Sequence, residues 1–205
     1  MDICCTNDSE QNLDREFWDK HWRDNQTGWD MGAVSPPLKE YIDQLDAKDI
    51  AILIPGCGNT YEAEYLLQNG FTNVTVIDIS PTLTAALQQK FGEAVGRTIH
   101  IVCGDFFELN NAFDLILEQT FFCALSPKLR LKYVMKMHSL LKPGGKLVGL
   151  LFNKQFEQEG PPFGGTAQEY EMLFAPYFRF KTFEECRNSH PKRKGSELFI
   201  NFVKH

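Results

Sequence analysis

Long apolar stretches are missing from this 205-residue chain. No segment approaches the roughly 18 consecutive apolar residues that would span a bilayer. The first residues, Met1 to Cys5, also lack the basic start and apolar run of a secretory signal. We therefore expect a cytoplasmic protein with no membrane partner. The length suits a single domain over residues 1–205.

Disulfide and metal-binding patterns are missing as well. The six cysteines include no C-x-x-C pair, and no histidine lies at zinc-ligand spacing from them. Three of them lie in apolar segments, where cysteine usually acts as a small hydrophobic residue. The sequence therefore predicts reduced thiols and no metal ion. The cysteines are Cys4, Cys5, Cys57, Cys103, Cys123 and Cys186.

Positive charge is scarce, and the formal net charge is −6 at pH 7. This balance argues against sequence-independent binding of nucleic acid, which depends on Lys and Arg beside phosphates. The basic run Lys192-Arg193-Lys194 lies before Gly195 and is typical of a turn. We expect a small molecule or an anion as partner. The acidic surface and short apolar strands are compatible with a monomer.

Apolar runs and helical patterns alternate along most of the chain. Residues 50–54 form a continuous apolar run, as in strands covered on both faces, and Ser80-Pro81 is a typical helix start. This alternation predicts an α/β fold with a mostly parallel sheet and helices on both faces. The last two strands predict an antiparallel C-terminal hairpin, which completes a seven-stranded sheet. The expected strands cover residues 50–54, 74–77, 99–102, 113–117, 146–152, 178–183 and 197–203, and the expected helices cover residues 61–68, 126–141 and a segment from residue 80.

The N-terminal part lies outside this alternation. Apolar residues at helical spacing predict one helix over residues 13–22 and another over residues 38–45. We interpret residues 1–45 as a helical lid and residues 46–205 as the Rossmann-like core of the same domain.

Glycines and acidic residues follow the first three expected strands. Gly56 and Gly58 let the backbone turn sharply and approach a ligand closely. Asp78 ends the second strand at about the spacing where a carboxylate accepts from ribose hydroxyls. Asp105 could accept from an adenine amino group while Phe106 covers the ring. Each feature alone also fits a plain turn, a helix cap or a solvated loop, but together they predict a nucleoside-containing cofactor.

The nature of this cofactor follows from two further features. Tyr61 replaces the third glycine of G-x-G-x-x-G, which removes the usual cradle for two phosphates. All the tryptophans lie near the N-terminus, at Trp18, Trp22 and Trp29, and indole is the best aromatic partner for a cation. Core packing would explain the same tryptophans. The combination favours S-adenosylmethionine, a sulfonium cation without a pyrophosphate, over a nicotinamide dinucleotide.

The residues also match a known family, in order and along nearly the whole chain. The chain resembles the thiopurine S-methyltransferase superfamily, and within it the thiol/halide (thiocyanate) methyltransferases of plants and similar bacterial enzymes. The tryptophans with G-W-D, P-G-C-G and F-F-C-A form a specific set, whereas L-K-P-G-G is common to many methyltransferases. The matching segments are residues 17–22 (FWDKHW), 28–30 (GWD), 55–58 (PGCG), 76–80 (VIDIS), 104–107 (GDFF), 121–125 (FFCAL), 140–145 (LLKPGG), 160–163 (GPPF) and 193–195 (RKG).

The resemblance implies a Rossmann-like class I methyltransferase fold. It implies methyl transfer from S-adenosylmethionine, with S-adenosylhomocysteine as product. Gly56 would contact the methionine part, Asp78 the ribose, and Asp105 with Phe106 the adenine, while Gln119 would lie beside the sulfonium and the acceptor. The cofactor-binding residues implied are Trp18, Trp22, Trp29, Gly56, Asp78, Asp105, Phe106 and Gln119.

The acceptor is expected beside Gln119, Trp18 and an apolar wall that includes Phe163. Thiopurine enzymes of the family resemble Asp-Arg-Gly after the fourth strand, and plant thiol/halide enzymes resemble Asp-Tyr. This chain has Glu118-Gln119-Thr120 there and lacks the charge for an anionic thiopurine. We therefore expect a thiol, hydrosulfide, thiocyanate or halide as acceptor.

Such nucleophiles need little help from a base, and the sequence shows no obvious catalytic residue. Two other functions stay open at this point. One is S-methylation of a thiopurine or aryl thiol, and the other is non-catalytic binding of S-adenosylmethionine by a regulator. Whether Gln119 replaces the arginine or tyrosine of relatives is not decided by the sequence.

Overall fold

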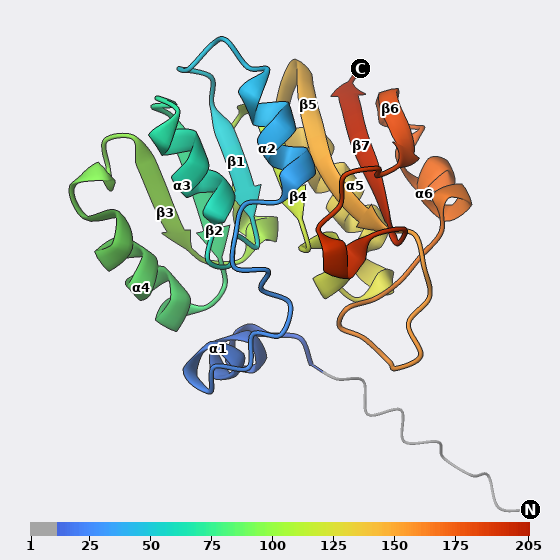
Figure 1. Ribbon diagram of the computed structural model, residues 1–205, viewed down its shortest axis with the longest axis horizontal. Helices are drawn as coiled ribbons and strands as arrows, with labels where there is room; N and C mark the ends of the chain where they lie inside the picture. Colours follow the sequence, from blue (N-terminus) through green and yellow to red (C-terminus); the bar gives the residue numbers. More distant parts are fainter. Residues whose placement is uncertain (1–11) are drawn as a thin grey trace, which may run out of the picture.

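The computed structural model describes residues 12–205, so Cys4 and Cys5 lie outside the described part. A seven-stranded sheet runs through the molecule in the order β3-β2-β1-β4-β5-β7-β6 (Figure 1). Neighbouring strands are parallel except that β7 runs antiparallel to β5 and to β6. The predicted α/β fold with an antiparallel C-terminal hairpin is confirmed. The strands are β1 (Ile52–Pro55), β2 (Val74–Asp78), β3 (Ile99–Cys103), β4 (Phe113–Gln119), β5 (Leu141–Phe152), β6 (Phe178–Glu185) and β7 (Glu197–Lys204).

Helices cover both faces of this sheet, because the central strand β1 is buried at every position and needs cover on each side. Helices α2, α3 and α4 bury Leu38, Leu66 and Leu83 against one face. Helices α5 and α6 bury Tyr133 and Phe174 against the other (Figure 1). The helices are α1 (Arg15–Arg23), α2 (Pro36–Asp43), α3 (Tyr61–Gln68), α4 (Pro81–Phe91), α5 (Arg130–Leu140) and α6 (Ala167–Phe174), with the 3-10 turns η1 (Gly92–Ala94), η2 (Phe106–Glu108), η3 (Phe122–Ala124), η4 (Pro127–Leu129) and η5 (Pro191–Arg193).

The helix starts follow the sequence signals at α4 and depart from them later in the chain. Ser80 Oγ accepts from the Leu83 amide at 3.1 Å and caps α4 as predicted. The single helix expected over residues 126–141 is instead divided into η4 and α5. Strand β5 starts already at Leu141, because Leu141 pairs with Phe113 before a shift in register.

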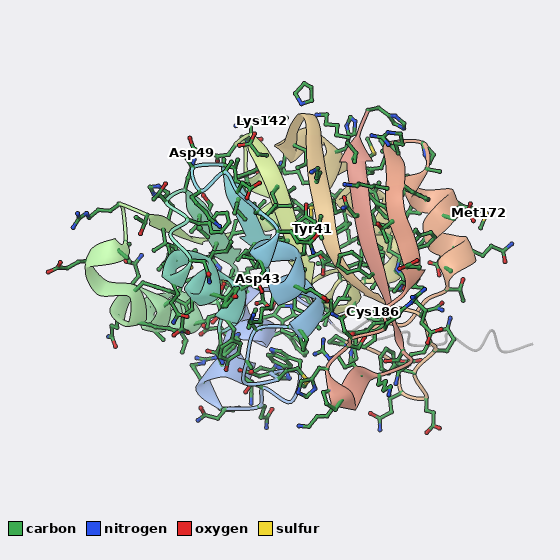
Figure 2. The ribbon with its side chains drawn as sticks, turned by 45° about the horizontal axis from the view of Figure 1, so that its top comes forward. Tyr41, Asp43, Asp49, Lys142, Met172 and Cys186 are labelled. Atoms are coloured by element: carbon green, nitrogen blue, oxygen red, sulfur yellow. The ribbon has the colours of Figure 1, made fainter. Side chains whose placement is uncertain are left out.

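The two N-terminal helices lie in different places. Helix α1 lies beyond the carboxyl ends of the parallel strands (Figure 1). Helix α2 belongs to the layer over the sheet, where Ile42 is buried and the ring of Tyr41 lies 6.5 Å from that of Phe199. Figure 2 shows Tyr41 above the central strands, and Met172 pointing outward from α6 at the edge of the sheet. We therefore propose a shorter lid, residues 12–34, in place of residues 1–45.

Three further findings concern membrane-spanning helices, disulfides and metal-binding clusters within the described residues. No helix within residues 12–205 is long and apolar enough to cross a membrane. The four cysteines of that range are free thiols. In the same part of the chain, no group of three or more His, Cys, Asp or Glu side chains is placed to hold a metal ion.

Candidate functional site

A cavity of about 970 Å³ lies at the carboxyl ends of the parallel strands, and side chains of α1 form part of its wall. Open α/β sheets bind their ligands at this edge. The structure brings all but one of the predicted site residues to this cavity, and Phe163 is the exception. The predicted residues that line it are Trp18, Trp22, Trp29, Gly56, Asp78, Asp105, Phe106 and Gln119.

The glycine loop after β1 turns sharply enough to form one wall. Gly56 and Gly58 have φ values of 53° and 52°, in the left-handed region that favours glycine. A Cβ atom on Gly56 would lie 2.1 Å from the ring of Phe121. The glycine thus allows the segment after β4 to approach the loop after β1.

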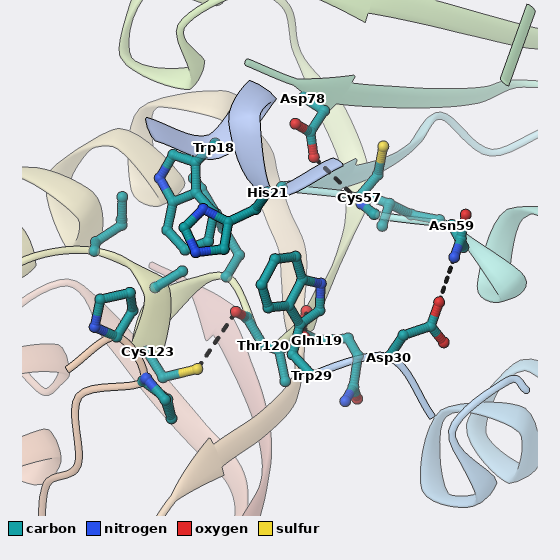
Figure 3. A pocket seen from close by; sticks show the side chains of 18 of the residues that line it. Trp18, His21, Trp29, Asp30, Cys57, Asn59, Asp78, Gln119, Thr120 and Cys123 are labelled. Carbon is teal, nitrogen blue, oxygen red and sulfur yellow. Dashed lines mark hydrogen bonds between the residues drawn. The ribbon is translucent and has the colours of Figure 1, made fainter. Parts of the chain in front are cut away.

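Tyr61, at the place of the missing third glycine, ties this loop to the lid. Its hydroxyl donates to Asp30 Oδ2 at 3.1 Å. The side-chain amide of Asn59 donates to the same oxygen, and Asp30 Oδ1 accepts from the Gly32 amide at 2.6 Å. Figure 3 shows the contact between Asn59 and Asp30 at the cavity wall. The polar groups of this loop therefore bind a carboxylate of the lid. In a dinucleotide-binding loop the corresponding place would hold a pyrophosphate.

Asp78 ends β2 and is only 9% exposed. Its Oδ1 accepts from the Ser80 amide at 3.0 Å, and its Oδ2 accepts from the Gly58 amide at 3.3 Å. Burial raises the pKa of this carboxyl. Each oxygen keeps a further lone pair, so the group can still accept from ligand hydroxyls.

The loop after β3 places a carboxyl and a ring next to each other. Asp105 is exposed, and its Oδ1 accepts from the Phe107 amide at 2.8 Å to begin η2. The ring of Phe106 is 4% exposed and lies 5.1 Å from that of Phe121 in an edge-to-face contact. Phe106 therefore belongs largely to the core and offers only part of its surface to the cavity.

The three indoles form an aromatic cluster on the lid side of the cavity. The ring of Trp29 lies 5.7 Å from that of Trp18 and 5.9 Å from that of Trp22, both nearly perpendicular. Such edge-to-face contacts stabilise aromatic pairs. Figure 3 shows Trp18 and Trp29 reaching into the cavity with His21. The face that these rings present is suited to a bound cation.

Helix α1 is held over the cavity by one buried carboxylate. Asp19 Oδ1 accepts from Ser80 Oγ at 2.6 Å and from the Thr82 amide at 2.8 Å. Burial opposes ionisation of Asp19, but these hydrogen bonds outweigh it and lower its pKa. Because the Ser80 amide donates to Asp78, the lid and the predicted ribose carboxylate share one serine.

Glu118 and Gln119 end β4. The side chain of Gln119 faces the cavity, and that of Glu118 is buried in the protein. Gln119 lines the cavity, and its Oε1 is buried without a hydrogen-bond partner among the described residues. Glu118 is fully buried and accepts from the amides of Phe121 at 2.8 Å and Phe122 at 3.0 Å, and from the hydroxyl of Tyr133. Burial raises the pKa of Glu118 to about 7. Glu118 thereby fixes the turn that positions Gln119.

The structure changes the apolar wall expected around Phe163. Phe152, Phe156, Pro161 and Pro162 line the cavity, and Phe163 does not. The Phe163 amide donates to Cys123 O at 2.7 Å. Its ring packs on Gly160, where a Cβ atom would lie 2.7 Å from the ring. Phe163 thus supports the loop, and its neighbours form the wall.

Sequence reasoning missed a buried arginine in the basic run. The run does turn, at η5, but Arg193 is only 8% exposed. Its Nη2 donates to Trp29 O at 2.9 Å, and its Nη1 lies 3.4 Å from Glu197 Oε1. Arg193 therefore holds the backbone of Trp29, a lid tryptophan, by a hydrogen bond. No spacing signal separates this buried arginine from Lys192 and Lys194, its exposed neighbours in the sequence.

Comparisons with known proteins bear on the family and the fold of the chain. The family model described as Thiopurine S-methyltransferase (TPMT) matches residues 13–204. The chain is 33% identical over 162 residues to "Probable thiol methyltransferase 2" of Arabidopsis thaliana, covering 78% of this chain and 71% of that protein. It is 32% identical over 212 residues to the Thiopurine S-methyltransferase of Vibrio vulnificus (strain YJ016), covering 92% and 94%.

A solved structure shows the same architecture. It is the 1,6-didemethyltoxoflavin-N1-methyltransferase of Burkholderia thailandensis with bound 1,6-didemethyltoxoflavin and S-adenosylhomocysteine. The TM-score is 0.72 at 21% identity, over 93% of this chain and 86% of that one. At this identity the likeness concerns the fold.

Proposed function

The chain belongs to the thiopurine S-methyltransferase family and is an S-adenosylmethionine-dependent methyltransferase, and from this premise we propose that its acceptor is a thiol, hydrosulfide, thiocyanate or halide. The observation that carries this choice is Gln119, a neutral amide at the end of β4, where the carboxyl ends of the strands meet. Membership of an enzyme family argues against the alternative of a non-catalytic regulator.

The residues around the cavity fit the cofactor of this family. Thr60 Oγ1 and Gln119 Oε1 both line the cavity and are buried without a partner among the described residues, so both can take a ligand's hydrogen bond. We assign the ribose to Asp78, and the adenine to Asp105 and Phe106. Gly56 would approach the methionine part. The sulfonium would face the lid indoles and Gln119, and we infer that Trp18 also borders the acceptor.

The protein's part in the reaction is then to position the acceptor and to exclude water. S-adenosylmethionine supplies a methyl group that its sulfonium already activates. The indoles of the lid cover one side of the reacting centre. Phe152, Phe156, Pro161 and Pro162 offer apolar surface on the acceptor side, which strips water from an anionic nucleophile and raises its reactivity. Orientation in such a closed site accounts for much of a displacement rate.

One observation favours a second acceptor class. Lys154 and Lys192 also line the cavity and are exposed. Their charge could take the place of the missing arginine and hold an anionic thiopurine or aryl thiolate. The name of the Vibrio relative is consistent with this reading.

A panel of acceptors with labelled S-adenosylmethionine tests the proposal. We expect turnover of iodide, thiocyanate, hydrosulfide or a small thiol, with little turnover of a thiopurine. In Gln119→Arg, a new cation in the cavity should raise kcat/KM for the anionic thiopurine about tenfold, the effect of roughly 1.4 kcal/mol.

The matched control is Gln119→Leu, which removes the amide and adds no charge. S-adenosylhomocysteine binding by calorimetry shows that the cavity is intact in each variant. Strong thiopurine turnover by the wild-type enzyme, abolished in Lys154→Ala or Lys192→Ala, would establish the second acceptor class instead.

A further inference from the structure

His21 lies on the lid, among the residues that face the reacting centre in the proposed function. It comes from α1, and its imidazole lies 6.1 Å from the ring of Trp18 and 5.9 Å from that of Trp29. Figure 3 shows the imidazole projecting from the helix into the cavity between these two indoles. It is therefore within the same aromatic cluster that we assign to the sulfonium.

A single contact determines which ring nitrogen of the neutral His21 imidazole carries the proton. Nδ1 lies 2.8 Å from Phe17 O, one turn earlier in α1. A carbonyl oxygen can only accept, so Nδ1 must carry the proton. In the neutral ring the other nitrogen, Nε2, then has a free lone pair. Because Nδ1 is held by the helix, Nε2 lies on the edge of the ring that is turned away from that carbonyl.

The second histidine of the cavity has the opposite arrangement. His190 Nδ1 accepts from the Lys192 amide at 3.3 Å, so in the neutral ring its Nε2 carries the proton. His190 can donate to a ligand, whereas His21 can accept a proton. The two histidines that line the cavity are thus not interchangeable.

Three of the carboxylates that line the cavity already have partners within the protein. Asp30 accepts from Gly32, Asn59 and Tyr61. Asp78 accepts from two backbone amides. Glu197 keeps an unpartnered Oε2 among the described residues, but its Oε1 forms an ion pair with Arg193 Nη1 at 3.4 Å.

We propose that His21 is the general base for thiol acceptors, an inference that rests on the proposed function. Nε2 takes the proton of the S–H group, which leaves an imidazolium and a thiolate. The thiolate sulfur forms a bond to the methyl carbon, and the methyl–sulfonium bond breaks. Its electron pair stays on the sulfur of S-adenosylhomocysteine, and the imidazolium then releases its proton to water.

A general base at His21 affects protonated thiols and anionic acceptors differently. An aliphatic thiol with a pKa of about 8.5 is mostly protonated at neutral pH and gains from a base. Iodide and thiocyanate carry no proton and gain nothing. His21 therefore extends the range of acceptors from anions to neutral thiols.

The experiment compares turnover of an aliphatic thiol and of iodide by the wild-type enzyme and by His21→Gln at neutral pH. We expect kcat for the thiol to fall about 100-fold, the lower end of the range for general bases, and kcat for iodide to stay unchanged. An aryl thiol that is already ionised should lose much less than the aliphatic thiol. The matched control is His100→Gln, an exposed histidine of β3 outside the cavity, which should alter neither rate.

Three results would overturn the assignment. Equal thiol rates in His21→Gln and wild type would show that Nε2 takes no proton. Parallel loss of thiol and iodide turnover, with S-adenosylhomocysteine binding intact, would assign His21 to positioning of the lid. A loss confined to thiols in Glu197→Gln, and absent in His21→Gln, would place the base at Glu197. If the wild-type enzyme methylates neither acceptor, the proposed function fails, and the role of His21 fails with it.

Discussion

Asp78 is the residue on which cofactor affinity should depend most. Its two oxygens already accept from Ser80 and Gly58, and we assign their remaining lone pairs to the ribose. In Asp78→Asn an amide nitrogen replaces one acceptor. Hydrogen bonds to a charged group contribute about 1.5–3 kcal/mol, so calorimetry should show S-adenosylhomocysteine affinity lower by about 10- to 100-fold.

Two effects of the same substitution on stability oppose each other. Burial raises the pKa of Asp78, which means that the folded protein bears a cost for the charged form. The neutral amide removes this cost, but its NH2 group faces a backbone amide of Ser80 or Gly58 that then loses its acceptor. Thermal unfolding of Asp78→Asn without ligand should therefore occur close to the wild-type temperature. Asp49→Asn, at an exposed loop position (Figure 2), is the control and should change neither property. Unaltered affinity in Asp78→Asn would remove Asp78 from the cofactor site.

The position of an individual cavity residue was predictable from the sequence where that residue directly follows a strand. Gly56 and Asp78 could be placed because parallel strands bring their carboxyl ends to one edge. His21 and Arg193 could not be assigned a function, since the roles proposed for them depend on which atoms their side chains contact in the fold. Phe163 was misplaced because its loop turns the ring onto Gly160. A side chain in a loop after the last parallel strand has no periodic pattern to fix its direction.

At the scale of elements, the docking of α1 should control access to the cavity. Asp19 joins α1 to the start of α4 through Ser80 and Thr82. Each such hydrogen bond to a carboxylate contributes about 1.5–3 kcal/mol, so in Asp19→Ala the docked lid should be at least about tenfold less favoured.

Intrinsic fluorescence can measure this directly, because all three tryptophans lie in the lid. We expect a red-shifted emission and weaker S-adenosylhomocysteine binding in Asp19→Ala, with the far-ultraviolet circular dichroism nearly unchanged. Asp24→Ala changes an exposed carboxylate of the same segment, paired with Lys20, and should leave the emission as in wild type. The same emission in both variants would mean that Asp19 does not hold the lid.

Most elements were predictable because their apolar periods are regular, and the errors have two causes. Helix α6 was not expected, although Thr166 caps it by accepting from the Glu169 amide at 3.2 Å, a spacing typical of a helix start. Its short amphipathic pattern follows a loop rich in Pro and Gly that obscures it. The placement of α2 over the sheet, and of α1 over the cavity, depends on tertiary packing that local periodicity does not contain.

At the scale of the whole molecule, the buried Glu118 should make the folding free energy depend on pH. Its carboxyl is fully buried in the central strand β4, with a pKa of about 7 against 4.5 when exposed. Between these values the unfolded chain has lost the proton that the folded protein still holds. The unfolding free energy therefore falls as pH rises from about 4.5 to about 7, and levels off above that.

Glu118→Gln should remove this dependence while it keeps most of the hydrogen bonds. The amide oxygen can still accept from Phe121 and Phe122, and the amide nitrogen can donate to Tyr133. Urea unfolding at about pH 5 and about pH 8 should show that wild type loses about 1–3 kcal/mol more than Glu118→Gln over this interval. The raised pKa of Glu62 and the lowered pKa of Asp114 are present in both proteins and cancel in the difference. If the two proteins lose equal stability, the proton of Glu118 does not distinguish the folded from the unfolded state, and the turn that holds Gln119 is then built on an ionised carboxylate at all these pH values.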